Sequence, residues 1–187
     1  MENVAAWRKE RRAELIGRRQ AIEPAQRRAW SEAIERHLRT VLVDRPPALI
    51  SFYWPFRGEF DPRPLVRDLL DQGWRAALPV VVQKKSPLEF RLWTPGAPMV
   101  DGIWNIPVPR DGAVATPELV LAPVVGFDDR CYRLGYGGGY YDRTLVTISP
   151  RAFAIGIGFE FSRLETIHPQ SFDQRLDTIV TEAEIRR

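Results

Sequence analysis

Four glycines lie within five positions, in a segment whose ends carry charged side chains. The segment runs from Arg133 to Arg143 and reads RLGYGGGYYDR. Closely spaced glycines permit positive φ angles and leave backbone N–H groups unobstructed by Cβ atoms, which suits a turn that binds phosphate. The flanking arginines match phosphate oxygens, and Asp142 is placed to hold a Mg²⁺ that bridges nucleotide phosphates. The glycines are Gly135, Gly137, Gly138 and Gly139.

The common nucleotide-binding patterns do not fit this segment. A Walker loop has Lys and then Ser or Thr after its last glycine, whereas Tyr140 and Tyr141 follow here. The dinucleotide pattern G-x-G-x-x-G would place a glycine at position 140, which is tyrosine. The segment therefore predicts a different phosphate-binding turn, with a plain tight turn as the alternative. For Asp142 the alternatives are a helix cap or an ion pair with Arg143.

The elements around the segment alternate between strands and helices. Strands that alternate with helices predict an α/β fold, Rossmann-like and three-layered, with a mostly parallel central sheet flanked by helices. An N-terminal helix pair precedes the first strand, and we expect it to pack across one edge of the sheet. We expect residues 1–187 to form a single domain. The expected strands are 48–53, 74–82, 88–93, 119–125, 152–159 and 178–181, the expected helices are 2–20, 24–45, 65–72 and 140–149, and 94–118 is expected to be an irregular connection.

Charge and composition narrow the class of protein. The net charge is only +3, but residues 1–45 hold eleven Lys and Arg against seven Asp and Glu. A basic start suits a phosphate-bearing ligand or nucleic acid, and a solvated basic helix is the alternative.

The composition also excludes some classes of site. One cysteine, Cys131, excludes an intrachain disulfide and a cysteine zinc site. No apolar run approaches the roughly 20 residues that span a bilayer, and the start lacks the order of a signal peptide. We expect a cytoplasmic protein.

The sequence resembles the 5-formyltetrahydrofolate cyclo-ligases, also called methenyltetrahydrofolate synthetases, over nearly the whole chain. The most specific part is Phe127-Asp128 followed by residues 133–143. Shorter similarities occur in the same order along the chain as in the family. They are Arg8 and Arg12 four residues apart, Glu59 after the first strand, Leu78-Pro79, Gly102-Ile103, and Asp173 and Asp177 before residues 179–182.

The resemblance implies an activity and its partners. ATP and Mg²⁺ would drive conversion of 5-formyltetrahydrofolate, with or without a polyglutamate tail, to 5,10-methenyltetrahydrofolate, with release of ADP and phosphate. Phosphorylation of the formyl oxygen makes it a good leaving group, and N10 then attacks the activated carbon. The protein's task would be positioning and charge neutralisation. We expect a monomer that binds neither nucleic acid nor membrane.

The resemblance also implies roles for individual residues. Arg133 and Asp142 would be catalytic, and Asp142 with Asp173 would hold the metal. Glu59 would accept hydrogen bonds from the pterin's amino group and ring N–H, and Trp54 and Tyr140 would line the folate site. ATP would be bound by Arg8, Lys9, Arg12, Arg133, Leu134, Gly135, Tyr136, Gly137, Gly138, Gly139, Tyr140 and Tyr141.

Three positions depart from the family pattern, and two other functions stay open. Cys131 stands where a glycine is usual, Asn105 replaces a carboxylate, and Arg8 replaces a frequent lysine. We expect Cys131 to be a passive residue and His168 to lie in a loop, with an approach of His168 to the site as the less favoured alternative. A nucleic-acid-binding module is the first rival, although acidic residues interrupt the basic helix. A relative of sugar-phosphate isomerases or CoA-transferases, which would need no ATP, is the second.

Overall fold

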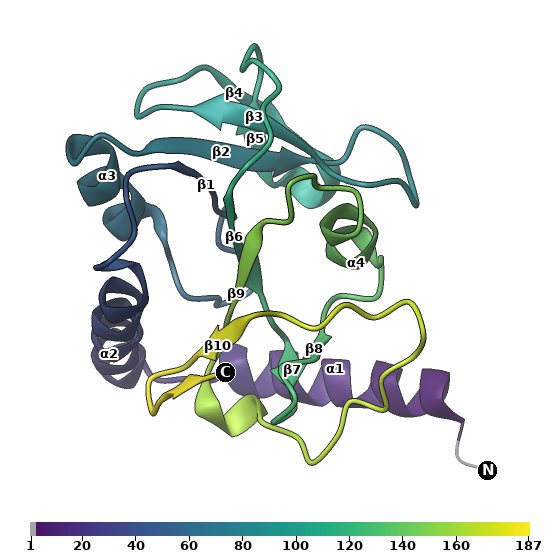
Figure 1. Cartoon of the computed structure of the whole chain (residues 1–187). Helices are drawn as coiled ribbons and strands as arrows, with labels where there is room; N and C mark the ends of the chain where they lie inside the picture. Colours follow the sequence, from purple (N-terminus) through teal and green to yellow (C-terminus); the bar gives the residue numbers. More distant parts are fainter. Residues whose placement is uncertain (1–2) are drawn as a thin grey trace.

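A seven-stranded sheet forms the middle layer of the structure, a computed structural model that describes residues 3–187. The order is β11-β10-β9-β6-β1-β2-β3; the inner strands run parallel, and the edge strands β3 and β11 are antiparallel to their neighbours (Figure 1). The mostly parallel sheet that the sequence predicts is confirmed. The strands are β1 Leu49–Ser51, β2 Arg75–Val80, β3 Glu89–Trp93, β6 Leu119–Pro123, β9 Phe153–Ile157, β10 Thr178–Val180 and β11 Ile185–Arg186.

Helices cover both faces of this sheet and complete the expected three layers. α2 and α3 lie on one face, and α4 lies on the other (Figure 1). The parallel register places Ile50 beside Ala76 and Leu119, and these side chains join α2 and α3 in one core. Successive strand residues point to opposite faces, so Leu49 and Val120 pack on the α4 side. The helices are α1 Val4–Gln20, α2 Pro24–Leu42, α3 Arg63–Asp71 and α4 Tyr140–Leu145, with short 3₁₀ helices η1 Ile103–Asn105 and η2 Glu160–Ser162.

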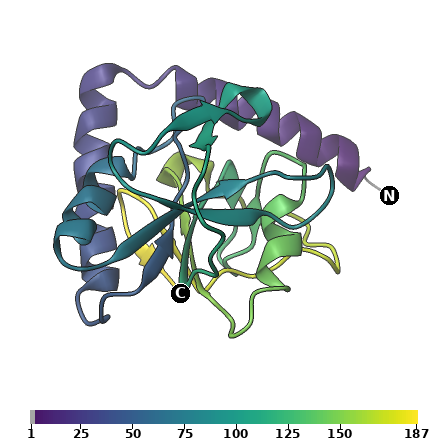
Figure 2. The same cartoon turned by 90° about the horizontal axis from the view of Figure 1, so that it is seen from above.

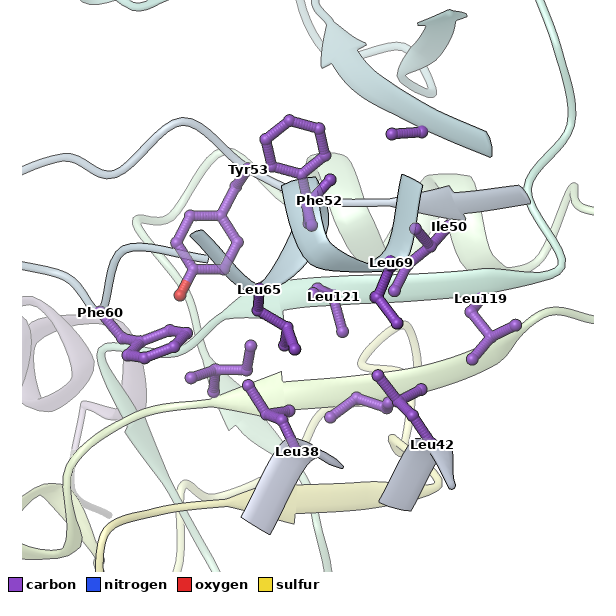
Figure 3. Packing of buried hydrophobic residues seen from close by; sticks show 14 of the residues in the cluster. Leu38, Leu42, Ile50, Phe52, Tyr53, Phe60, Leu65, Leu69, Leu119 and Leu121 are labelled. Carbon is purple, nitrogen blue, oxygen red and sulfur yellow. The ribbon is translucent and has the colours of Figure 1, made fainter. Parts of the chain in front are cut away.

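The apolar stripe of α2 attaches this helix to the sheet. Ile34, Leu38 and Leu42 recur every four residues, so they share one helix face, and none is more than 4% exposed. They pack in one cluster with Leu65 of α3 and Leu121 of β6 (Figure 3). This is the core-facing stripe that the sequence predicts.

The first helix lies across the ends of the strands instead of on a face. Leu15 is buried beside Gly126, in a short strand that follows β6. The guanidinium of Arg19 donates to the carbonyl of Val124, just beyond β6, and to that of Arg57, beyond β1. Figure 2 shows α1 and α2 meeting at a corner. The helix pair is therefore confirmed, but the expected packing across an edge is wrong, because α2 covers a face and α1 covers the strand ends.

Two segments contain strands that the sequence patterns did not predict. The connection 94–118 includes a hairpin of β4 (Met99–Asp101) and β5 (Pro107–Pro109), with η1 between them. Prolines are tolerated in such edge strands because no inner ladder needs their N–H groups. A second hairpin pairs β7 (Gly126–Phe127) with β8 (Arg133–Leu134), and β8 forms the start of the glycine segment. The four glycines therefore follow a hairpin, and not the buried strand directly.

Some expectations concern the chain as a whole. Residues 1 and 2 belong to the expected first helix and to the expected single domain, and both lie outside the described residues. A single domain over residues 1–187 stays a prediction. Within residues 3–187, none of the helices combines the length and the apolar character that crossing a membrane requires.

Truncating a buried side chain of α2 tests the packing of the helix layer. We expect Leu38→Ala to lower the free energy of unfolding by about 2–5 kcal/mol, because it removes apolar contacts and leaves a cavity. Val43→Ala is the matched control, since Val43 is 73% exposed. Urea denaturation of both variants gives the comparison, and equal losses would contradict the packing described.

Candidate functional site

A cavity of ≈ 210 Å³ opens beyond the carboxyl ends of β1, β2 and β6. This is where ligands bind in open parallel sheets. The glycine segment forms one wall, and α1 contributes a second through Arg8 and Arg12. The β4–β5 hairpin forms a third wall, and Phe172 and Asp173 also line the cavity. The hairpin residues that line it are Gly102, Ile103, Trp104, Ile106, Pro107 and Val108. Four segments that are far apart in the sequence therefore enclose one space.

The cavity brings together almost all the residues that the sequence singled out. Lys9 is the exception, because its side chain is exposed on α1 and does not line the cavity. His168 does not line it either; its ring lies edge-on against Trp7, with 4.7 Å between centroids. The candidates that line the cavity are Arg8, Arg12, Trp54, Glu59, Arg133, Leu134, Gly135, Tyr136, Gly137, Gly138, Gly139, Tyr140, Tyr141, Asp142 and Asp173.

Arg8 is a buried cation with a full set of partners. Its guanidinium pairs with Asp173, and the two side chains are only 9% and 7% exposed. It also donates to the carbonyls of Ile167 and His168, at 3.0 Å each. These bonds hold segment 167–173 against α1. The arrangement favours a positioning role for Arg8 over a direct contact with phosphate.

Arg133 and Asp142 form a second pair at the glycine segment. Arg133 Nη2 lies 3.0 Å from Asp142 Oδ2, and the side chains are 4% and 13% exposed. Asp142 Oδ1 also accepts from the backbone N–H of Gln174 at 3.2 Å. Arg143, which the sequence left as a possible partner of Asp142, instead donates to the carbonyl of Gly138. Asp142 therefore links the glycine segment to the C-terminal loop.

Arg12 differs from both, because it makes no ion pair among the described residues. Its Nε donates to the carbonyl of Gly135 at 2.7 Å, and its guanidinium lies beneath Gly137. Burial and the nearby Arg8 lower the pKa of Arg12, while Asp173 partly opposes this effect. A half-buried cation without a carboxylate partner attracts an anion, and the cavity is the place from which the anion would approach.

The backbone of the glycine segment explains why its glycines are required. Gly137 and Gly139 have φ angles of +95° and +64°, in the left-handed region that favours glycine. The guanidinium carbon of Arg12 would lie 3.5 Å from a Cβ at Gly137, an ordinary contact, so the φ angle is what favours glycine there. The turn therefore exposes backbone N–H groups above a cation. Cys131 has a φ of +61° in the β7–β8 hairpin, which accounts for glycine being usual at this position.

A buried carboxylate marks the other end of the cavity. Glu59 Oε1 accepts from the Tyr136 hydroxyl at 2.5 Å, and Oε2 accepts from the Phe56 N–H at 2.8 Å. Arg19 Nη2 lies 3.8 Å from Glu59 Oε1 and also donates to the Tyr136 hydroxyl. Burial raises the pKa of Glu59, although Tyr136, Arg19 and the Phe56 N–H hold back part of the rise. This end of the cavity suits a ligand edge that carries N–H donors.

Sequence reasoning missed several contributors to this site. Arg19 is the main one, and a signal for it existed. Spacings of four and seven residues place Arg8, Arg12 and Arg19 on one helix face, but only the first two were singled out. Tyr53 carried no such signal, because it stands within an ordinary apolar run. The lining residues that sequence reasoning did not assign include Tyr53, Phe56, Ile103, Trp104, Ile106 and Phe172.

Asp142 and Asp173 are the carboxylates that the sequence assigns to Mg²⁺. No group of three or more His, Cys, Asp or Glu side chains suited to a metal occurs within residues 3–187. A nucleotide-bound Mg²⁺ needs only one or two carboxylates, because phosphates and water supply the other ligands. Both oxygens of Asp142 already accept hydrogen bonds, from Arg133 and from the Gln174 N–H, and both oxygens of Asp173 accept from Arg8 and from the Gln170 N–H. Each carboxylate oxygen has a second lone pair, so a metal role for Asp142 and Asp173 stays a prediction.

The raised pKa of Glu59 predicts how stability responds to pH. Because the pKa is higher in the folded state than the unfolded value of about 4.3, the folded wild type gains stability as pH falls through the interval between them. Glu59→Gln removes this titration. We expect the free energy of unfolding of wild type, relative to Glu59→Gln, to rise as pH is lowered from 8 toward 4.3.

Urea denaturation across this pH range measures the difference. Glu10→Gln, which removes an exposed carboxylate on α1, is the matched control. The prediction is contradicted if the free energy of unfolding of wild type, relative to Glu59→Gln, falls as the pH is lowered. That result would show that the pKa of Glu59 in the folded state lies below its ordinary value.

The chain matches one family and several proteins that bear its name. The sequence profile described as the 5-formyltetrahydrofolate cyclo-ligase family matches residues 4–182. The chain is 28% identical over 180 residues to 5-formyltetrahydrofolate cyclo-ligase of Haemophilus influenzae, which covers 92% of this chain and 96% of that protein. It is 27% identical over 179 residues to the Escherichia coli K12 protein of the same name, with 90% and 96% covered.

Solved structures share the fold. A 5,10-methenyltetrahydrofolate synthetase from Aquifex aeolicus superposes with a TM-score of 0.83 and 27% identity, over 96% of this chain and 92% of that one. One from Mycoplasma pneumoniae, at 23% identity, shows the same fold with a TM-score of 0.77, over 94% and 98%. Since the profile spans nearly the whole chain and the named relatives are enzymes, this chain is an enzyme of the 5-formyltetrahydrofolate cyclo-ligase family.

Proposed function

We propose that this enzyme converts 5-formyltetrahydrofolate to 5,10-methenyltetrahydrofolate, with ATP and Mg²⁺, and releases ADP and phosphate. The Haemophilus, Escherichia and Aquifex relatives carry names that describe this conversion. The observation that carries the proposal is Arg12, a half-buried cation that makes no ion pair within residues 3–187 and lies against Gly135 and Gly137 of the glycine turn. A triphosphate supplies the negative charge that this position lacks.

The arginines of the cavity have two different roles in this proposal, phosphate binding and the positioning of loops. Arg8 and Arg133 are already neutralised by Asp173 and Asp142. Their role in this proposal is to hold the C-terminal loop and the glycine segment around the nucleotide. Arg12, with the N–H groups of the turn, contacts the phosphates. Lys9 joins the ATP site only if its exposed side chain reaches around the helix, so its assignment is the weakest of the set.

The folate lies toward Glu59 in this proposal. The carboxylate accepts hydrogen bonds from the pterin's 2-amino group and N3–H, which match its two oxygens. Trp54 and Tyr140 line the same cavity and provide flat surfaces for the folate. With phosphates at one end and the pterin at the other, the formyl group lies between them.

Ring closure needs a better leaving group than oxide. The formyl oxygen attacks the γ-phosphorus of ATP, the bond from that phosphorus to the β-phosphate oxygen breaks, and ADP leaves. N10 then attacks the activated carbon and loses its proton, and the phosphorylated oxygen departs as phosphate. The chain contributes alignment of the reacting atoms and neutralisation of charge. Asp142 would hold Mg²⁺, which neutralises phosphate charge when it is bound.

The rival functions have less support. The arginines of α1 that line the site point into the fold and not outward, which weakens the case for a nucleic-acid surface. No specific observation favours a sugar-phosphate isomerase or a CoA-transferase. A monomer and a cytoplasmic location are further parts of the proposal.

An absorbance assay tests the proposed reaction. We expect the methenyl-folate absorbance to grow from 5-formyltetrahydrofolate only when ATP and Mg²⁺ are both present, and to stop when EDTA removes the metal. Controls omit one component at a time. A folded preparation that produces no signal with all components would overturn the proposal.

Replacing the unpaired cation tests the ATP site. We expect Arg12→Gln to lower kcat/KM for ATP by about 10- to 100-fold, the worth of a charge-assisted hydrogen bond to phosphate. The affinity for 5-formyltetrahydrofolate and the Tm should change little, because no carboxylate loses its partner. Arg18→Gln is the matched control, since Arg18 lies on α1 with its side chain 52% exposed. Unchanged ATP kinetics in Arg12→Gln would remove Arg12 from the site.

A further inference from the structure

Tyr53 lines the cavity and carries a buried hydroxyl that makes no hydrogen bond within residues 3–187. It follows β1, and its ring packs with Phe52 and Leu65 in the main core, where the residue is only 4% exposed (Figure 3).

An unpaired buried hydroxyl is costly, so its persistence calls for a partner from outside the chain. The hydroxyls of Ser51 and Tyr141 are also buried and unpaired among the described residues. Ser51 does not line the cavity, and Tyr141 lines it within the glycine segment, where the Arg133 guanidinium lies over its ring. Tyr53 is held rigidly by the core packing of its ring, so its hydroxyl cannot turn away toward another group. The cavity is the place from which a partner can come.

The neighbours of Tyr53 indicate the chemistry of that partner. Burial raises the pKa of Tyr53 well above its ordinary value, and the nearby carboxylate of Glu59 adds to the rise. Tyr53 therefore keeps its proton and can donate a hydrogen bond. Glu59, on the same side of the cavity, can only accept. A hydroxyl donor next to a carboxylate acceptor matches a ring edge with two N–H donors followed by a carbonyl.

We propose that the Tyr53 hydroxyl donates a hydrogen bond to the 4-oxo oxygen of the pterin, whose 2-amino group and N3–H face Glu59. This inference rests on the proposed function, because it places the folate end of the substrate at Glu59. Tyr53 would then be a specificity-determining residue that distinguishes a 4-oxo group from a 4-amino group on the ring. A 4-amino ring would put a donor against Tyr53 and leave the phenolic hydrogen without an acceptor.

The test compares two ligands and three proteins. Wild type, Tyr53→Phe and Tyr132→Phe are titrated in the absence of ATP with 5-formyltetrahydrofolate and with a 2,4-diaminopteridine analogue of folate. Tyr132 is the matched control, because among the five tyrosines of the described chain it is the one that does not line the cavity. The Tm and the turnover of each protein are measured in parallel.

We expect Tyr53→Phe to bind 5-formyltetrahydrofolate roughly 3- to 10-fold more weakly, the worth of one neutral hydrogen bond. Binding of the diamino analogue should change less than about 2-fold, which is below the worth of one such bond. The Tm should stay level or rise, since the variant deletes an unpaired hydroxyl. Tyr132→Phe should match wild type in every measurement.

Three results would overturn the inference. One is unchanged affinity of Tyr53→Phe for 5-formyltetrahydrofolate while wild type turns it over. The second is an equal loss for both ligands, and the third is a loss accompanied by a lowered Tm, which would indicate a structural role. Failure of the proposed function is a separate outcome, because wild type itself would then show no turnover.

Discussion

Three arginines on one face of α1 tie this helix to segments that the chain places far away. Arg8 reaches segment 167–173, Arg12 reaches the glycine segment, and Arg19 reaches the ends of β1 and β6 together with Glu59. Because a guanidinium donates its hydrogen bonds within a fixed plane, it sets direction as well as distance. Without these contacts the cavity would lose one wall and the fixed position of two others.

The distribution of charge within the cavity follows from which arginines are paired. Two buried ion pairs neutralise Arg8 and Arg133, and these pairs organise the loops that carry them. Breaking such a pair leaves an isolated buried charge, so the loops resist displacement. Arg12 is left with positive charge that no residue of the described chain neutralises. The ion pairs of Arg8 and Arg133 therefore hold the loops in place, and Arg12 is the position that attracts an anion.

The sequence was informative where local spacing determines structure. The stripe of Ile34, Leu38 and Leu42, the apolar strands and the left-handed glycines each follow from neighbours a few residues apart. Pairings between distant segments were beyond that reasoning. The choice of Arg133 over Arg143 as the partner of Asp142 depends on how β8 approaches α4. Lys9 fails to reach the cavity because it lies one position around the helix from Arg8, which the resemblance alone did not reveal.

The pairing of Arg8 with Asp173 also bears on when the site can form during synthesis. The two residues are 165 positions apart, so a growing chain presents α1 long before its partner exists. The strands from β1 to β9 precede residue 173, and they can pair while the emerging chain still lacks it. Folding from the N-terminal side is the usual order on the ribosome. The cationic face of α1 therefore remains uncompensated in nascent chains, and the catalytic pocket is among the last parts of the protein to be completed.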